Sequence, residues 1–156
     1  MEQIFSKLNF STHGEGLIDI THDLNLFIKK NKFHSGIFNL TSLHTSCSLT
    51  INENADPNVL VDLKKYMQSI VPHNSYLTLS KKREEIAYKH FQEGADDMPA
   101  HIKTSLTNTC LSLSFQEGQI MLGTWQAVYL WEHRFDQKER IINVHIIGEK
   151  SQNIYN

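Results

Sequence analysis

The clearest pattern of apolar and polar positions is a strict alternation within the segment 36–52. After a break near Thr41, two sets of residues alternate. One face carries Leu43, Thr45, Cys47, Leu49 and Ile51, and the other carries His44, Ser46, Ser48, Thr50 and Asn52. A period of two residues is typical of a β-strand. The small hydroxylated face would fill a core poorly, so we expect it to line a ligand cleft or to face solvent.

Weaker alternation predicts further strands along the chain. We expect them near residues 4–11, 17–20, 76–80, 104–115, 120–132 and 140–148. Gly14, Gly16 and the QEGQ run at 116–119 indicate turns between strands. The last three of these strands follow one another without a predicted helix, which favours antiparallel pairing.

Two segments combine helical periodicity with a residue that suits a helix start. Thr21 is the expected N-cap of a helix that ends near Lys30. Asp56 is the expected N-cap of a second helix, which has Pro57 in its first turn and ends before Pro72. These are the two main helices that the sequence predicts.

The segments 81–91 and 93–101 are less regular. The run KKREEIAYKHF looks helical, because Glu85 and Lys89 are four residues apart. The run EGADDMPAH is expected to be a loop, since it mixes glycine, proline and adjacent carboxylates. The order of elements predicts an α+β domain in which antiparallel strands dominate and the helices are set aside. The sequence contains no glycine-rich phosphate-binding loop of the Rossmann or Walker type.

Composition narrows the class of protein. The chain has 156 residues, 40% of them hydrophobic and 21% charged, which suggests one globular domain over residues 1–156. A formal net charge of -2 argues against a nucleic-acid partner. With two cysteines, no signal-peptide pattern and no apolar stretch near the roughly 20 residues that a bilayer requires, we expect a cytoplasmic protein without a membrane partner.

Three polar segments carry candidate chemistry. The first is the strand that begins at His44. The second, EGADDMPAHIK, offers two aspartates, a histidine and a lysine, and the third, GTWQAVYLWEHR, joins an aromatic strand to Glu132, His133 and Arg134. Imidazoles and carboxylates together suit a divalent metal or a proton transfer. Taken alone, the first segment could equally be a solvated sheet face, the second a solvated loop and the third an ordinary edge strand with a charged end.

In this order, HTSCSLTINENADP, EGADDMPAHIKTS and GTWQAVYLWEHR resemble the YjbQ-like family, also described as secondary thiamine-phosphate synthases. The resemblance covers about Gly14 to Glu149. It implies an α+β domain with an antiparallel β-sandwich, a homotrimer and a cleft lined by motif residues. It also implies a weak activity that joins a hydroxymethylpyrimidine pyrophosphate to a thiazole phosphate and releases pyrophosphate.

The chain departs from the family pattern in two places. Ala55 stands where the family often has a cysteine, so a mechanism that needs a thiol there does not apply. The segment 76–91 is longer than the family leads us to expect, and a loop there would reshape the mouth of the cleft.

The matching motif positions give the predicted site. The catalytic candidates are His44, His101, His133 and Asp97; the substrate-binding candidates are Ser46, Glu53, Asp96, Lys103, Trp125, Gln126 and Arg134. Of these, Lys103 and Arg134 are expected to contact phosphate, and Trp125 to pack beside a ring. These residues predict that the binding partner of the site is a phosphorylated small-molecule substrate.

A divalent metal ion is the predicted cofactor, with His44, His101 and His133 as its ligands. Three imidazoles suit zinc better than magnesium, which prefers oxygen, so the identity of the ion stays open. A metal-dependent hydrolase of a phosphorylated small molecule is therefore the main alternative enzyme. A non-catalytic module that binds a phosphorylated metabolite is the other alternative.

Overall fold

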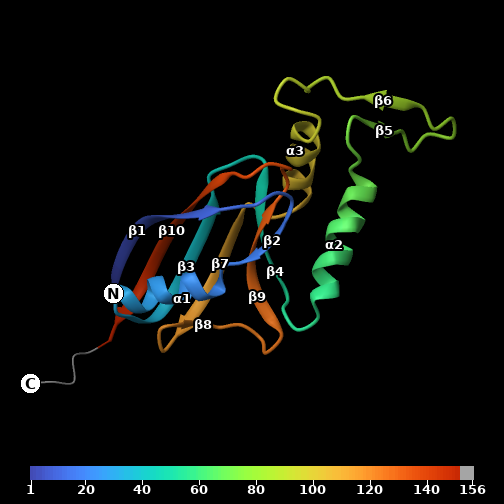
Figure 1. Ribbon diagram of the computed structural model, residues 1–156. Coiled ribbons are helices and arrows are strands. Elements are labelled where there is room, and N and C mark those ends of the chain that lie inside the picture. The colour runs from blue at the N-terminus through green and yellow to red at the C-terminus, as the bar shows by residue number, and fades with distance from the viewer. Residues whose placement is uncertain (152–156) are drawn as a thin grey trace, which may run out of the picture.

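The alternating segments form antiparallel sheets in the computed structural model, which describes residues 1–151 (Figure 1). The larger sheet has the order β1-β10-β3-β7-β8 and the second has the order β2-β9-β4. Their strands are β1 (Glu2–Ser11), β2 (Gly16–Asp19), β3 (Phe33–Ser42), β4 (Cys47–Glu53), β7 (Cys110–Gln116), β8 (Gln119–Ile120), β9 (Gln126–Glu132) and β10 (Glu139–Lys150). The strands β5 (Ser75–Leu77) and β6 (Glu85–Ala87) pair only with each other. The predicted α+β class is confirmed.

The hydrophobic core takes side chains from the five-stranded sheet, from the smaller three-stranded sheet and from helix α1 (Thr21–Lys30). Phe38 of β3 and Val144 of β10 join it from the larger sheet, and Leu24 joins it from α1. The smaller sheet adds Leu49 and Leu130, which face each other across the β4–β9 pair. All five are fully buried. This core therefore fixes β4 and β9, whose ends carry the sequence motifs.

Both predicted helices are present, but only one predicted cap is correct. Asp56 is the N-cap of α2 (Pro57–Ile70), and its side chain accepts a hydrogen bond from the backbone of Asn58. The prediction for Thr21 is wrong, because Ile20 is the N-cap and Thr21 is the first helical residue. The Thr21 hydroxyl instead accepts from the Val128 N–H at 2.8 Å, which ties α1 to β9.

The segment 93–101 is a loop only as far as Asp96. Its last five residues begin α3 (Asp97–Leu106), so the described residues contain a third helix besides the two main ones that the sequence predicted. Its proline lies in the first turn, where the missing N–H is tolerated. The helix buries Asp97, Lys103 and Thr104 along with small residues, so no apolar stripe marked it in the sequence.

Other expected boundaries also change. The run 81–91 is not a helix: it contains the short strand β6 and irregular backbone. The strand expected over 104–115 begins only at Cys110, and the extended segment 120–132 is divided between β8 and β9. The alternation that begins at Leu43 forms a strand only from Cys47, so His44 lies in the turn between β3 and β4.

Helices α2 and α3 flank the smaller sheet, and the β5–β6 hairpin projects beyond them (Figure 1). None of the residues of α2 is buried in the protomer. Within residues 1–151, no helix combines the length and the apolar character that a membrane crossing needs.

Candidate functional site

The start of α3 meets the end of β9 through Arg134. Its guanidinium donates from Nε to Asp96 Oδ2 at 3.0 Å, from Nη1 to Asp97 Oδ1, and from Nη2 to the Glu93 carbonyl at 2.6 Å. Burial alone would raise the pKa of Asp96, but the Phe135 N–H and Arg134 outweigh it and hold that pKa below its usual value. The second and third motifs are thus joined by buried ion pairs.

A third buried carboxylate, that of Glu132, lies next to this contact. Glu132 accepts from Arg140 Nε at 2.7 Å, from Arg140 Nη2 at 2.5 Å and from the Thr12 hydroxyl at 2.8 Å. The backbone N–H groups of His133 and Arg134 also donate to it. Burial raises its pKa, yet these donors more than compensate and leave the pKa of Glu132 low. Its lone pairs are therefore used within the protein.

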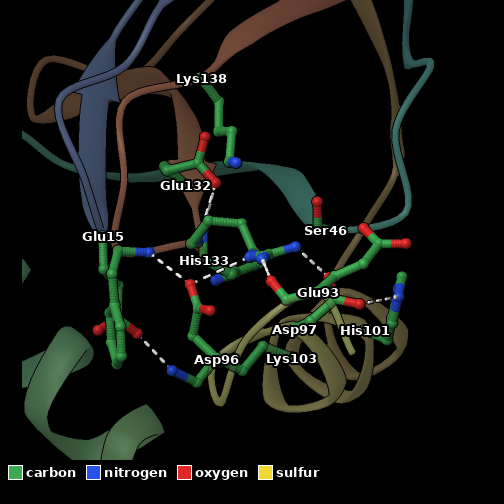
Figure 2. A network of polar contacts seen from close by, with 12 residues as sticks. Glu15, Ser46, Glu93, Asp96, Asp97, His101, Lys103, Glu132, His133 and Lys138 are labelled. Carbon is green, nitrogen blue, oxygen red and sulfur yellow. Dashed lines mark hydrogen bonds and ion pairs between the residues drawn. The ribbon is translucent and has the colours of Figure 1, made fainter. Parts of the chain in front are cut away.

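Lys103 is fully buried and pairs with Glu15 (Figure 2). We refer to Glu15, Asp96, Lys103, Glu132, Arg134 and Arg140 together as the buried seam. Its members include Lys103 and Arg134, the two residues predicted to contact phosphate. The structure pairs both cations with acids, and their phosphate role stays a prediction.

His133 and His44 are held by internal hydrogen bonds. His133 is fully buried, and its Nε2 is 2.9 Å from the Ser48 hydroxyl. Burial, helped by the charge of Lys103, lowers the pKa of His133 to about 3, so this imidazole is neutral at pH 7. His44 accepts from the Ile141 N–H at 2.8 Å, and burial followed by the charge of Arg140 lowers its pKa as well.

His101 has a different environment at the solvent edge of α3. Its Nδ1 donates to the Thr45 carbonyl at 2.8 Å, and its Nε2 lies 3.5 Å from Asp97 Oδ2. The same carboxylate oxygen is 2.6 Å from Nε2 of His90. We call His90, Asp97 and His101 the open cluster, because the two imidazole side chains are 47% and 32% exposed. Figure 2 shows Asp97 directed toward His101.

The predicted metal ligands do not come together as expected. Among the described residues, the group of three potential ligand atoms within 4.8 Å of one another is the open cluster, which contains neither His44 nor His133. The polar Nε2 atoms of these two histidines already have the hydrogen-bond partners described above. Of the three predicted ligands, only His101 belongs to the group.

His90 was not among the candidates from the sequence. Read as part of a polar run, it had no partner, because the segment after it was expected to be a loop. Asp97 and His101 are four residues apart, so one turn of α3 places them on the same face. Recognising that helix would have paired Asp97 with His101, whereas His90 lies seven residues before Asp97 in irregular backbone, where no sequence pattern marks its approach.

A depression of about 350 Å³ adjoins the open cluster. It brings His44 and His101 together, and hydroxyls surround them: its lining is His44, Thr45, His101, Thr104, Ser105, Thr107 and Thr109. Imidazole and hydroxyl groups can donate hydrogen bonds to an anionic oxygen. Ser46, another candidate, is buried nearby and its carbonyl is 3.5 Å from Arg140 Nη2.

The remaining candidates lie at the opposite end of β4 and β9. Glu53, Trp125 and Gln126 line a separate depression of about 600 Å³. Glu53 pairs with Gln126, whereas Cys47, six residues earlier, pairs with Glu132 beside the buried seam. At about 3.3 Å per residue, these ends are roughly 20 Å apart. Within one protomer, the predicted site residues are therefore divided between two regions.

Known proteins are similar to this chain in both sequence and fold. The family model described as "UPF0047 protein YjbQ-like" matches residues 6–149. The UPF0047 protein sll1880 of Synechocystis is 37% identical over 142 residues, which cover 91% of this chain and 90% of that protein. The UPF0047 protein YjbQ of Escherichia coli O157:H7 is 38% identical over 143 residues, or 91% and 96% of the two chains.

A solved structure has the same arrangement of elements. The conserved hypothetical protein TT1486 of Thermus thermophilus superposes with a TM-score of 0.75 at 30% sequence identity, over 91% of this chain and 99% of that chain. The match of nearly the whole sequence and this structural similarity agree with the motifs. The chain belongs to the UPF0047, YjbQ-like family.

Proposed function

We propose that this protein is a thiamine-phosphate synthase-like transferase that acts on phosphorylated small molecules. The family resemblance suggests the reaction, and the depression between His44 and His101 is the observation that supports a site for it. Its imidazoles and hydroxyls suit an anionic ligand, and the cavity lies beside a half-exposed histidine rather than within the buried seam.

The reaction is a displacement. The lone pair of the thiazole nitrogen forms a bond to the methylene carbon of the pyrimidine precursor. The bond from that carbon to the pyrophosphate oxygen breaks, and pyrophosphate leaves with the electron pair. Positive charge develops on the pyrimidine and negative charge on the leaving group, so donors placed at the leaving oxygens stabilise the transition state. His44, whose Nε2 accepts from Ile141 and leaves the other ring nitrogen as a donor, and the surrounding hydroxyls are our candidates for those donors, and His101 lines the same depression.

We also infer the finer architecture that the family resemblance implies, namely a β-sandwich in the protomer and a homotrimer in solution. Exposed apolar surface supports assembly: α2 has no buried residue, and Leu77 and Leu79 of the hairpin region are 57% and 105% exposed. Light scattering after size-exclusion chromatography tests this directly. The mass of three protomers is expected, and the mass of one contradicts it.

Assembly would also explain why the motif residues are divided. We infer that the Trp125 end of one protomer and the His101 end of another contribute to one site. Trp125→Ala and His101→Ala proteins are each expected to be inactive. Mixing them under conditions that exchange protomers should restore part of the activity if the site is shared. No recovery, with exchange verified by mass spectrometry, contradicts a shared site.

The decisive assay measures pyrophosphate and thiamine phosphate with both precursors present. Wild-type protein is expected to form the two products in equal amounts, and His101→Ala is expected to abolish them. His22→Ala is the matched control, because His22 is exposed on α1, outside both depressions. Absence of product with the wild type, or full turnover by His101→Ala, contradicts the proposal.

Hydrolysis is the second candidate, because the two imidazoles and the carboxylate of the open cluster suit metal-assisted attack by water. The same assay without the thiazole precursor separates the two reactions. Phosphate or pyrophosphate release that does not require the second precursor identifies a hydrolase.

A further inference from the structure

We propose that His90, Asp97 and His101 form a binding site for a divalent transition-metal ion with the preferences of zinc. Their three potential ligand atoms lie within 4.8 Å of one another. Two neutral imidazoles and one carboxylate match the donors that zinc and similar first-row ions select, whereas magnesium and calcium favour oxygen alone. Binding of an ion needs no substrate, so this site does not depend on the proposed reaction.

The cluster is oriented by contacts outside it. The Thr45 carbonyl accepts from His101 Nδ1 at 2.8 Å, which leaves the lone pair on Nε2 when the ring is neutral. Arg134 donates to the other oxygen of Asp97, and so fixes the carboxylate. Asp97 itself is only 3% exposed at its side chain. Such support for ligand orientation is typical of metal sites.

His101 Nε2 and Asp97 Oδ2 face each other at 3.5 Å. Nδ1 of the same ring already donates to the Thr45 carbonyl, so Nε2 is the nitrogen that remains to bind a cation. Two acceptors at this separation repel each other unless a proton or a cation lies between them. A metal ion satisfies both, and it makes use of the second imidazole that approaches the same oxygen.

The distances fit a tetrahedral ion with a small adjustment. Ligands about 2.1 Å from zinc at tetrahedral angles are separated by about 3.4 Å. The His101 Nε2 to Asp97 Oδ2 distance of 3.5 Å already agrees. The His90 Nε2 to Asp97 Oδ2 distance of 2.6 Å is that of a hydrogen bond, so on metal binding His90 would carry its proton on Nδ1 instead, and the contact would open by roughly 1 Å.

The site would have an open coordination position. The Asp97 carboxylate is buried, whereas the His90 and His101 side chains are 47% and 32% exposed. Three protein ligands that leave a position for water or substrate are characteristic of catalytic zinc sites rather than structural ones. His101 also lines the depression with His44, so the open cluster adjoins the proposed anion site.

The experiment is calorimetric titration of chelator-treated protein with Zn²⁺, without substrate. All proteins carry Cys110→Ser, because the exposed Cys110 thiol would itself bind zinc. One ion per protomer is expected. His90→Ala and His101→Ala should each weaken binding by more than about 100-fold, because loss of a ligand exceeds the loss that a supporting residue causes. His22→Ala, an exposed histidine outside the cluster, should bind as the parent does.

Titration with Co²⁺ gives an independent measurement. Intense visible absorption is expected from the parent and from His22→Ala, and weak absorption from the two cluster variants. The His90→Ala variant is expected to fold, because 47% of the His90 side chain is exposed, so its loss of binding can be measured. The proposal is overturned if the parent shows no stoichiometric binding, if His90→Ala binds as tightly as the parent, or if His22→Ala loses as much affinity.

Discussion

The buried seam and the open cluster use the same kinds of side chain for opposite purposes. In the seam, Lys103 and Glu132 are fully buried, and each charge faces an opposite charge within the protein. In the open cluster, His90 is half-exposed and its imidazole approaches a single carboxylate oxygen. Asp97 of the open cluster links the two regions, since one of its oxygens pairs with Arg134 of the seam and the other faces the histidines.

This difference shows why a charged motif residue is not by itself a binding residue. Arg134 has acidic or carbonyl partners for its Nε, Nη1 and Nη2 groups, so a ligand would have to displace them. Removing one partner of a buried ion pair leaves an uncompensated charge, which is costly. The seam therefore holds α3 against β9, and the accessible chemistry remains at the edge of that helix.

The largest expected effect comes from breaking the seam at its centre. Glu132→Ala leaves the buried Arg140 without its carboxylate, and we expect the free energy of unfolding to fall by about 3–5 kcal/mol. Urea denaturation monitored by fluorescence measures it. Glu149→Ala, at an exposed position of β10, is the control and should change stability by about 0.5 kcal/mol or less. Equal effects would contradict a structural role for Glu132.

Variants of Lys103 and Glu15 test whether the charge of Lys103 serves the stability of the fold rather than phosphate binding. Lys103→Met keeps most of the side-chain volume but removes the cation from Glu15, whose carboxylate keeps only its hydrogen bond from Gln68, so we expect a loss of roughly 2–3 kcal/mol. Adding Glu15→Gln should recover much of that loss. If the double variant is as unstable as the single one, the ion pair does not explain the burial of Lys103.

Acid should weaken the seam region through His133. The unfolded chain binds a proton on this imidazole near pH 6.5, while the folded protein does so only near pH 3. Unfolding therefore takes up a proton between these values, and the free energy of unfolding falls as the pH falls, by about 1.4 kcal/mol per unit for one proton. His133→Asn should reduce this slope between pH 6 and pH 5. An unchanged slope would mean that His133 is protonated in the folded state.

The smallest expected effect on stability is at the open cluster. His90→Ala removes a half-exposed imidazole from Asp97, and we expect the free energy of unfolding to change by about 1 kcal/mol or less. Thermal unfolding in the presence of a chelator measures it. A loss comparable to that of Glu132→Ala would place His90 in the structural frame rather than in an accessible site.

The sequence predicted the sheet-forming segments well, because a half-buried strand repeats its pattern every two residues. β1 and β10 pair over ten positions, where their alternation was visible. Helix α3 was missed, since its buried residues are Asp97, Pro99, Ala100, Lys103 and Thr104 rather than large aliphatic ones. No hydrophobic period reveals a helix that is held by ion pairs to other segments.

The family resemblance implied a cleft lined by residues of all three motifs. The contacts of Arg134 with Asp96 and Asp97 join the second motif to the third, and the role of these residues as a site stays a prediction. The sequence did not reveal which charges are paired internally, because Glu15 and Arg140 are distant in sequence from their partners. Exposure and pairing depend on tertiary structure, and they separate His101 from His133.

The central claim is that the buried seam is structural and that the open cluster and the adjoining depression bind ligands. A crystal soaked with Zn²⁺ and pyrophosphate tests this claim most directly. Anomalous diffraction at the zinc edge should place one ion between His90 Nε2, His101 Nε2 and Asp97 Oδ2, with pyrophosphate in the adjoining depression beside His44. The Glu15–Lys103 and Glu132–Arg140 pairs should be unchanged. Zinc bound elsewhere, or pyrophosphate that displaces Asp96 and Asp97 from Arg134, would contradict it.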